Sequence, residues 1–600
     1  MSDKPSFFAE LQRRHVYKVG AMYAVAGWLL VQVITQVFPI YEISTHVQRI
    51  FVGMIVAGFP VALVLAWMFD ITPAGIVRTE GLLASGESPA AVRERHGTDR
   101  KLNYLLAALL LLSVGYGILD HTLLRRSADV SAVDVASDKS IAVLPLAIIG
   151  ADDKDSYLGD GISGELLTAL SKLPGLKVIG RTSSFQFRGR DVDVAKVGKA
   201  LNVRSLLSGT VQRAGEELRI TVELVDTASG QQLWSQHYDR SFKNLFALED
   251  DISGEVSKAL AVKLGAEVEL PLVPVATDNP KAHDLYLQAS LLNQRSDEAS
   301  LNQALVLLDQ AIAEDPNYAA AWALQALSYV ALADAYRAPK ELLPAMKAAA
   351  EKAVALDSTL AEAHAVLSMI LVDYVRDYPA GRREMERAIA LGPDSTLVYG
   401  SVALYRFDAE HDAAAARIET QKAEKLDPLD PWNFFAETNY AIVLGDIEGA
   451  ESVAAHVLRL DPKFVYGSDP LVSVYAASGR WQLCIDRAQA VQASGERPPN
   501  FAAAICHAHA GNPDRARDTL QQMEAAAKTS YVDSTRIAAI RVALGDKDGA
   551  FAALDQADRD RSANLMEVWA EPWFAPLHAD PRYRALLDRI GAGAQVRVSP

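Results

Sequence analysis

Three long apolar runs stand within the first 120 residues of the chain. The runs Val19 to Phe38, Ile50 to Phe69 and Leu102 to Leu119 contain no charged residue. A helix of roughly 18–20 residues crosses the hydrocarbon core of a bilayer, which is ~30 Å thick. Soluble helices normally carry a polar stripe, so a buried core helix is the weaker interpretation of these runs. The pattern predicts a membrane anchor over residues 1–126, with transmembrane helices at about 19–38, 50–69 and 102–119.

Basic residues flank these runs unequally, and this asymmetry predicts an orientation. Basic residues favour the cytoplasmic side, so the N-terminus and the second loop are expected in the cytoplasm and the rest of the chain in the periplasm of a bacterium. Arg125 and Arg126, after the third run, oppose this orientation. The first loop holds Arg49, and the basic residues of the two flanks expected in the cytoplasm are Lys4, Arg13, Arg14, Lys18, Arg78, Arg93, Arg95, Arg100 and Lys101.

After a polar linker at residues 127–138, the pattern changes to short strands and helices. Apolar and polar residues alternate from Leu218 to Val225, which indicates a strand with one buried face. A small α+β domain is predicted over residues 139–265, followed by a linker at 266–279. Its expected strands are 140–146, 177–180, 203–211, 218–225 and 231–238, and its expected helices are 162–173, 194–201 and 244–264.

From Asn279 onward the sequence is rich in alanine and helical in pattern, and it repeats. A Leu-Asp-Pro-like phrase recurs at steps of about 34–35 residues after one longer step, which indicates an insertion near 336–343. A period near 34 with a closing proline is typical of tetratricopeptide repeats. A second phrase places glycine and then alanine between paired helices, at Gly445 and Ala450, Gly511 and Ala516, and Gly545 and Ala550. An all-α solenoid of about seven repeats is predicted over 280–560, with a C-terminal cap and tail at 561–600.

The overall composition narrows the function. A chain of 600 residues is too long to fold around a single hydrophobic core, so several domains are expected. The net charge of -16 argues against a nucleic-acid partner. Cys484 and Cys506 lie on helices expected to be neighbours; a disulfide is possible, and two separately buried thiols are the favoured alternative. His507 and His509 beside Cys506 do not form a compact ligand set on a helix, so no metal and no cofactor is predicted.

Two groups in the α+β segment are candidates for binding an anion or a partner. Asp160 and Gly161 are expected just before a helix, whose first amides could bind an anion, although a simple helix cap is the favoured interpretation. Arg181, Arg188 and Arg190 form a basic cluster after the second strand, where a solvated loop is the blander interpretation. No catalytic motif is found, so we predict that the chain is not an enzyme.

Several phrases together resemble the TolB-like (FlgO-like) N-terminal domain found in some tetratricopeptide-repeat proteins. They are Ser-Ile-Ala-Val-Leu-Pro at 140–145, Leu-Gly-Asp-Gly-Ile-Ser-Gly-Glu-Leu at 158–166, Leu-Lys-Val-Ile-Gly-Arg-Thr-Ser-Ser-Phe at 176–185 and Leu-Trp-Ser-Gln-His-Tyr-Asp at 233–239. Phe-Asp-Ile-Thr-Pro-Ala-Gly at 69–75 is similar to the membrane region of the same family. The resemblance implies that relatives can carry a class III nucleotide cyclase or a winged-helix domain. About 18 residues precede the first apolar run, so neither is expected here.

Two functions remain open from the sequence. The first is a scaffold in the inner membrane that binds a protein or peptide through the groove of its repeats. The alternative is a transmembrane sensor whose TolB-like domain binds a ligand or partner and signals to a cytoplasmic protein. The sequence identifies neither the partner nor the oligomeric state.

Overall fold

The structure is a computed structural model, and it describes most of the chain after residue 138. The described residues are 139–149, 156–171, 173, 175–189, 193–214, 217–241, 251–252, 254–256, 258–259, 277–333, 335–464, 469–493 and 501–592, with residues 23, 25–28, 30, 32, 55, 59, 69–72 and 75–78 before them. The chain divides into two compact units, Met1–Asp134 and Val135–Pro600.

In the first unit, the described residues between 23 and 32 are helical. The Tyr23 hydroxyl donates a hydrogen bond to the Ile55 carbonyl oxygen at 2.8 Å, and the Tyr23 ring lies 5.7 Å from that of Phe59. Strands β1 (Phe69–Thr72) and β2 (Gly75–Arg78) form an antiparallel hairpin, so Phe69 belongs to a strand and not to the end of the second predicted span. The three predicted spans otherwise fall mostly outside the described residues. No helix in the described part of the chain combines the length and hydropathy that a membrane crossing requires.

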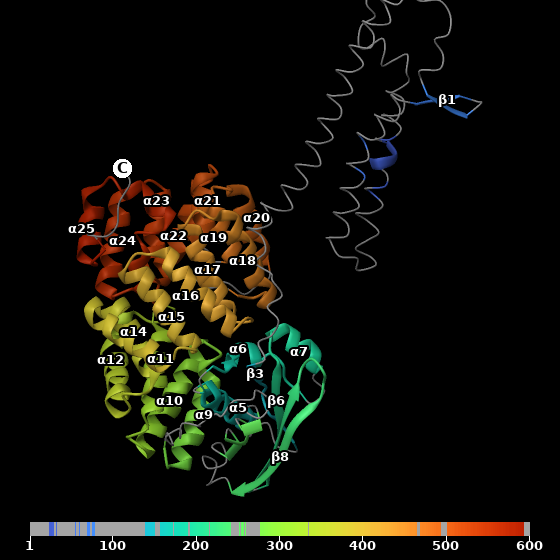
Figure 1. The fold of residues 1–600 in the computed structure, drawn as a ribbon. Helices are drawn as coiled ribbons and strands as arrows, with labels where there is room; N and C mark the ends of the chain where they lie inside the picture. Colours follow the sequence, from blue (N-terminus) through green and yellow to red (C-terminus); the bar gives the residue numbers. More distant parts are fainter. Residues whose placement is uncertain are drawn as a thin grey trace, which may run out of the picture. The chain divides into compact units, whose positions relative to one another are not determined.

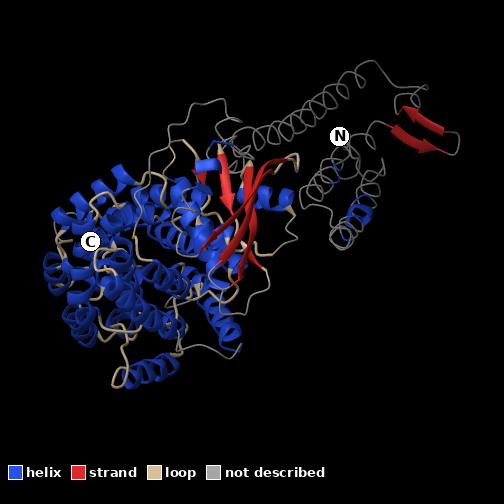
Figure 2. Cartoon of the chain, turned by 90° about the horizontal axis from the view of Figure 1, so that it is seen from below, coloured by secondary structure: helices blue, strands red, loops and turns tan. Residues whose placement is uncertain are grey.

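The second unit begins with a small domain built on a six-stranded mixed sheet. Strand β3 pairs in parallel with β5 and β6, and β4 pairs in parallel with β6. Strands β6, β7 and β8 form an antiparallel meander, and the order in the sheet is β5-β3-β6-β7-β8 with β4 beside β6. The strands are β3 (Ser140–Val143), β4 (Ala147–Ile148), β5 (Lys177–Val178), β6 (Ser205–Ala214), β7 (Glu217–Asp226) and β8 (Gln232–Ser241). We call this the sheet domain; Figure 2 shows its strands in red beside the helices of the same unit.

Helices cover both faces of this sheet. Alternate residues of a strand point to opposite faces, so Ile141 and Val143 pack with helix α5 (Ser156–Ser171), while Ala142 packs with helix α7 (Val194–Leu201). Helix α5 begins at Ser156, six residues before the predicted start. Its apolar face therefore includes Leu158 as well as the expected leucines.

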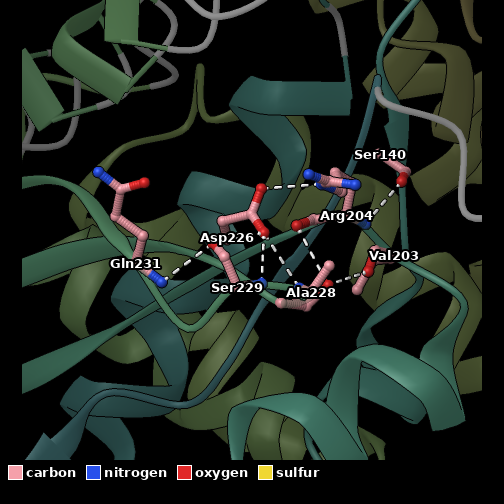
Figure 3. A network of polar contacts seen from close by, with 8 residues as sticks. Ser140, Val203, Arg204, Asp226, Ala228, Ser229 and Gln231 are labelled. Atoms are coloured by element: carbon pink, nitrogen blue, oxygen red, sulfur yellow. Dashed lines mark hydrogen bonds and ion pairs between the residues drawn. The ribbon is translucent and has the colours of Figure 1, made fainter.

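A buried carboxylate organises the edge of the sheet where β7 turns into β8. Asp226 is buried, and its Oδ2 pairs with Nε of Arg204 at 2.8 Å. Its Oδ1 accepts hydrogen bonds from the amides of Ala228 and Ser229 at 3.1 and 2.9 Å, which holds the turn closed (Figure 3). The Arg204 amide in turn donates to the Ser140 hydroxyl, so this network joins β3, β6 and β7.

The described residues between 280 and 560 form eight consecutive pairs of helices, where the sequence indicates about seven repeats. Figure 1 shows how these pairs follow one another. We call the two helices of a pair its first and second helix. The pairs are α9 (Pro280–Asn293) and α10 (Glu298–Glu314); α11 (Ala319–Leu332) and α12 (Pro339–Leu356); α13 (Ala361–Met369) and α14 (Tyr378–Leu391); α15 (Thr396–Leu404) and α16 (Ala413–Leu426); α17 (Pro431–Val443) and α18 (Ile447–Leu460); α19 (Pro470–Ala477) and α20 (Trp481–Ala493); α21 (Phe501–His509) and α22 (Pro513–Ala526); α23 (Ser534–Ala543) and α24 (Lys547–Asp560).

The repeated phrases have the local roles that their residues predict. Gly445, Gly511 and Gly545 end first helices with φ of 76°, 83° and 80°, the left-handed region that glycine adopts without strain. The alanines five residues later are fully buried, which lets the second helix pack closely. Aspartates cap the second helices α10, α14, α16, α18 and α24; Asp446, for example, accepts a hydrogen bond from the Gly449 amide at 3.0 Å.

Two first helices end differently. Helix α13 continues into the π-helical turn η7 (Ile370–Val375), and α15 continues into η8 (Tyr405–Ala409). These turns contain the buried carboxyl groups of Asp373 and Asp408. Such π turns are rare within helices and occur frequently at functional sites.

The chain after α24 folds back onto earlier repeats. We call residues 562–577, which include the 3₁₀ helices η9 (Ala563–Glu567) and η10 (Pro572–Leu577), the return segment; helix α25 (Pro581–Arg589) follows it. Trp569 of this segment lies 5.1 Å from the ring of Phe407 in η8. The Tyr378 hydroxyl of α14 donates to the carbonyl oxygen of Ile590, beyond α25. The predicted cap therefore contacts the third and fourth helix pairs as well as the last one.

The sheet domain meets the repeats at two places. Leu287 of α9 packs into the core of the domain beside α5. The second place is the loop between α16 and α17, where Asp427 accepts hydrogen bonds from the amides of Ser183 at 2.6 Å and Thr182 at 3.3 Å. We call the second place the Asp427 contact.

Candidate binding site

The predicted basic cluster belongs to the joint between the sheet domain and the first repeat. Arg188 forms a two-pronged ion pair with the buried Asp160 carboxylate, at 2.6 and 2.8 Å. Arg181 donates from Nη1 to the hydroxyl of Ser290 on α9 at 3.0 Å and from Nη2 to the backbone oxygen of Asp160. Burial lowers the pKa of Arg181 below its ordinary value. Arg190 lies outside the described residues.

The expected turn before a helix is wrong, because Asp160 and Gly161 lie inside α5. The free amides of a helix are those of its first turn, which here begins at Ser156. A Cβ added to Gly161 would lie 2.7 Å from the Leu287 side chain, so this glycine permits close packing of α5 against α9. Asp160, Gly161, Arg181 and Arg188 are thus all engaged in contacts within the described chain.

A cavity of about 120 Å³ lies against the first helices of the later repeats. We call the surface formed by these first helices and η8 the inner face. The return segment crosses this face and closes one side of the cavity, so part of the groove expected from the sequence is filled by the chain itself. The lining residues are Phe407 of η8; Phe435, Asn439, Ile442 and Val443 of α17; Ser473 of α19; Phe501 of α21; Asp533, Thr535 and Arg536 at α23; and Asn564, Glu567, Ala570, Glu571, Pro572 and Trp573 of the return segment.

Asp533 holds the return segment to the inner face. It is buried, and its carboxylate accepts hydrogen bonds from the Asn564 side-chain amide at 2.8 Å and the Ser562 hydroxyl at 3.2 Å. It also caps α23 by accepting from the amide of Thr535 at 3.0 Å, and it forms a longer ion pair with Arg536 at 3.7 Å. The Asp533 carboxylate is therefore engaged in contacts that hold the return segment and the start of α23.

Glu571 stands in a different electrostatic setting. Its carboxylate accepts a hydrogen bond from the Trp573 indole at 3.0 Å. Burial is the main cause that raises the pKa of Glu571 to about 8, and the charge of Glu567 is the second cause. A carboxyl group with so perturbed a pKa inside a cavity is a candidate functional group.

Further carboxyl groups lie behind the cavity wall. Burial and the charges of Asp373 and Glu567 raise the pKa of Asp408 well above its usual range. Burial raises the pKa of Tyr440 on α17, and the charges of Asp408, Glu567 and Asp373 raise it further. The two π turns and the return segment thus gather acidic groups at one place on the inner face, although the three stretches are far apart in sequence.

Aromatic rings form much of the remaining wall. Phe501 and Trp573 meet edge to face with ring centroids 5.7 Å apart, and the Arg536 guanidinium lies 5.8 Å from the Phe501 ring centroid. The cavity therefore combines aromatic surface with carboxyl groups.

The cysteines do not remain as two separate thiols, the alternative that the sequence favoured. Cys484 of α20 and Cys506 of α21 form a disulfide with their Cα atoms 6.3 Å apart. The two helices are packed neighbours, which brings the side chains within bridging distance. His509 stacks on Trp481 at 4.5 Å. Within the described residues, no group of His, Cys, Asp and Glu side chains is arranged to hold a metal ion.

The sequence did not single out the cavity residues Glu567, Glu571 and Trp573. They lie in the stretch that breaks the repeat period, and only a cap was expected there. A usable signal was present, since residues 566–573 alternate acidic and tryptophan residues in Met-Glu-Val-Trp-Ala-Glu-Pro-Trp. Nothing in that pattern shows that the stretch folds back onto α17.

The chain is similar to a curated protein named putative adenylate cyclase 3 from Rhizobium meliloti (strain 1021). The two are 34% identical over 237 residues, which is 39% of this chain and 40% of that protein. The chain thus matches less than half the length of this relative. No protein-family model matches the sequence.

Solved structures with similar helical architecture share little sequence with the chain. The human IFIT1 dimer with m7Gppp-AAAA is 14% identical with a TM-score of 0.35, and it covers 53% of this chain and 81% of its own. YrrB, a TPR protein with an unusual peptide-binding site, is 17% identical with a TM-score of 0.21, covering 41% and 97%. Yeast Tom70 is 14% identical with a TM-score of 0.32, covering 73% and 88%. These scores are low, and the assignment to a helical-repeat fold rests on the eight helix pairs of the chain itself.

Proposed function

We propose that this protein is a membrane-anchored, non-catalytic scaffold that binds a partner protein through the inner face of its helical repeats. The observation that carries the proposal is the cavity on that face, which four successive first helices and the return segment line together. Stacked helix pairs commonly present such a surface to an extended peptide.

Anchoring in an inner membrane, with the repeats in the periplasm, is part of the proposal. It is supported by the three uncharged apolar runs and by the basic residues that flank the first and third of them. Val25, Trp28 and Leu30 also expose large apolar side chains on described helical residues. The Cys484–Cys506 disulfide is favoured by an oxidising compartment such as the periplasm.

A crosslinking experiment with the full chain tests partner binding. A photo-crosslinking amino acid is placed at Asn439, which lines the cavity, and in a matched variant at Glu448, which is exposed on α18. We expect one discrete adduct from position 439 and none from position 448. Equal labelling at both positions, or none at either, would refute binding through the inner face.

Topology is tested with reporters fused after residue 135 and at the C-terminus. Both are expected to report the periplasm. Reporters active in the cytoplasm would move the search for a partner to that compartment and would leave the crosslinking test unchanged.

The non-catalytic part of the proposal faces a specific alternative, because the matched relative is named a putative adenylate cyclase. The support for it is the lack of any catalytic motif in the sequence. The purified full chain, incubated with ATP and magnesium or manganese, is expected to form no cyclic AMP. Steady formation of cyclic AMP would overturn this part.

A further inference from the structure

The volume of the cavity on the inner face limits what can occupy it. The cavity measures about 120 Å³, and an engineered protein cavity of ~150 Å³ holds one benzene molecule. Sites for drug-sized ligands are larger, at roughly 300–1,000 Å³. The cavity therefore suits a single side chain of about the size of one ring.

Aromatic walls of this cavity are held in place from behind. The Phe407 ring centroid lies 4.9 Å from that of Tyr440 and 5.1 Å from that of Trp569. The Phe435 ring centroid lies 5.3 Å from that of Phe464. Because these rings already pack against other rings, a guest that enters the cavity has little left to order, and preorganised walls of this kind favour binding.

The rings also decide which side chain fits best. Phe435, Phe501 and Trp573 line the cavity, and Phe501 and Trp573 already meet edge to face. A further ring can pack against them edge to face or offset, which adds attraction beyond the burial of its apolar area. An aliphatic side chain of the same size would have the burial alone, so an aromatic guest is favoured.

Most charged groups of the wall are already engaged within the chain. Asp533 accepts hydrogen bonds from the Asn564 side-chain amide and the Ser562 hydroxyl. Arg536 pairs with Asp533, and both Arg536 and Glu567 have further interactions within the chain. None of these groups therefore requires a guest of opposite charge.

Glu571 is a wall group whose charge changes just above neutral pH. Burial is the main cause that raises its pKa to about 8, so at neutral pH it is mostly protonated and uncharged. A neutral acid is compatible with an apolar guest, whereas an ionised carboxylate would lose water beneath that guest at a cost in free energy. The groups that face it are Glu567 and Asp533, which raise its pKa, Arg536 and the Trp573 indole, which lower it, and Tyr583 of α25, whose own pKa is raised by burial and by Glu571.

We propose that the cavity binds an aromatic side chain of the partner protein, a phenylalanine or a tyrosine, whose ring packs among Phe435, Phe501 and Trp573 while Glu571 is protonated. This inference rests on the proposed function and specifies the chemistry of the partner: an aromatic residue in a segment that lies along the inner face.

Binding is expected to weaken as the pH rises, because the guest favours the protonated form of Glu571. When the protonated form alone binds, the apparent affinity falls in proportion to its population, which is a loss of roughly tenfold at about pH 9 for a pKa of about 8. A cationic guest would show the opposite trend, since it favours the ionised carboxylate.

A competition titration of the full chain in lipid nanodiscs tests the choice of side chain. The probe is an acetylated and amidated pentapeptide with a central 4-fluorophenylalanine between glycines and alanines, followed by its ¹⁹F NMR signal. The competitors carry tyrosine, cyclohexylalanine or arginine at the same position. Nanodiscs without protein correct for partition of the peptides into lipid.

We expect the tyrosine peptide to displace the probe at about pH 6.5 at a concentration about threefold lower than the cyclohexylalanine peptide, because of the ring contacts. The arginine peptide should need a concentration at least about tenfold higher than the tyrosine peptide, because its charge loses water in an apolar site. Displacement by arginine as efficient as that by tyrosine would overturn the proposal.

The role of Glu571 is tested with a matched pair of variants. E571Q keeps the shape of the side chain and stays uncharged, so it should bind the probe as the wild type does at about pH 6.5 and keep that affinity at about pH 9. E448Q, on the exposed surface of α18, should show the wild-type loss at high pH. A pH-dependent loss that persists in E571Q contradicts the proposal. Thermal unfolding of E571Q shows that the variant is folded.

A second pair of variants tests the place of binding. Val443 lines the cavity, and its neighbour Leu444 is 45% exposed and lies outside the lining. Val443→Phe enlarges a wall residue and should abolish binding of the probe, while Leu444→Phe should leave it unchanged. Binding of the probe to Val443→Phe with wild-type affinity would place the aromatic site elsewhere and refute the assignment to this cavity.

The crosslinking assay separates this inference from the proposed function. If the adduct at position 439 forms in the wild type and is lost in Val443→Phe, both stand. If it forms equally in Val443→Phe, the scaffold function stands and the aromatic side chain in the cavity is refuted. If no adduct forms in the wild type, the proposed function itself fails.

Discussion

The return segment and the Asp427 contact both join stretches that lie far apart in the chain, and they do so by opposite means. The return segment contacts the inner face through side chains that are fully buried, including Leu565, Met566 and Phe574. The Asp427 contact depends on hydrogen bonds, among them one of 2.6 Å from the Gly180 amide to the Leu426 carbonyl oxygen and one of 2.7 Å from the Leu429 amide to the Ser183 hydroxyl.

Many buried apolar side chains hold the return segment in place, whereas the Asp427 contact depends on a few hydrogen bonds and largely on one residue. Apolar burial is non-directional and proportional to area, so the return segment is part of the core and not a detachable lid. Hydrogen bonds contribute little net free energy but are costly to leave unmade, so the Asp427 contact should be sensitive to one substitution. The cavity lies in the permanent region, which explains how acidic groups can be kept there at a cost in stability.

The largest expected effect is in the return segment. Phe574→Ala should destabilise the C-terminal repeats by about 3–5 kcal/mol, because it empties a fully buried site. Ala575→Ser, one residue later and exposed, is the control and should change stability by less than about 0.5 kcal/mol. Denaturant unfolding followed by tryptophan fluorescence measures both. A small effect of Phe574→Ala would mean that the segment is a detachable element after all.

The second effect depends on pH and tests the cavity within this region. The raised pKa of Glu571 means that the folded protein holds its proton more tightly than the unfolded chain. The stability that this protonated group contributes is fully present below its ordinary pKa of 4.5 and is lost as the pH rises through about 8. Glu571→Gln should therefore match the wild type at about pH 4.5 and be more stable by roughly 2–4 kcal/mol at about pH 9. Thermal unfolding of both proteins is measured across this pH range. A difference in stability that does not change with pH would contradict the assignment of the raised pKa to Glu571.

The third effect concerns the Asp427 contact. Asp427→Ala removes the acceptor of the amide of Ser183, which is buried, and of the amide of Thr182, and should cost about 1–3 kcal/mol. Asp461 occupies the same place in the next repeat, and its carboxylate accepts from the Lys463 amide at 2.8 Å within its own turn. Asp461→Ala is therefore the matched control, with a smaller expected loss. Hydrogen exchange of the Thr182 and Ser183 amides should increase in the first variant alone; equal exchange in both would remove the distinction.

The smallest effect is at the edge where α24 meets α12. Lys340 and Asp560 form an ion pair of 2.6 Å, and the lysine is about half exposed. Lys340→Met should cost roughly 0.2–1 kcal/mol at low salt and nearly nothing at about 1 M salt, because an exposed ion pair is screened. A loss that persists at high salt would show that the lysine stem contributes by packing.

Much of the fold could be predicted because its signals are local. The succession of strands and helices along the chain and the helix pairs follow from alternation, capping residues and turn glycines, all of which act within a few residues. The order of the strands within the sheet is not local and was not predicted. The start of α5 was misplaced, because Ser156 to Gly161 lacks the apolar periodicity that marks a helix. Asp160 and the arginines Arg181 and Arg188 were predicted as two separate groups, and the structure brings them together through the Arg188–Asp160 ion pair. The contact of Arg181 with α9 depends on a helix about 100 residues away, which no local pattern reports.

By itself the sequence determined the repeating units: a glycine with positive φ, a small alanine, and an aspartate before a proline produce the same helix pair wherever they recur. Only the tertiary structure decided which copy of a repeated residue does something different. Asp427 and Asp461 are equivalent in the pattern, and Asp427 alone of the two meets the sheet domain. The gathering of Asp373, Asp408, Glu567 and Glu571 was likewise decided by the path of the chain after α24. The physical reason is range, since capping and turn preferences act over one helical turn, while contacts between distant segments depend on how all the pairs stack.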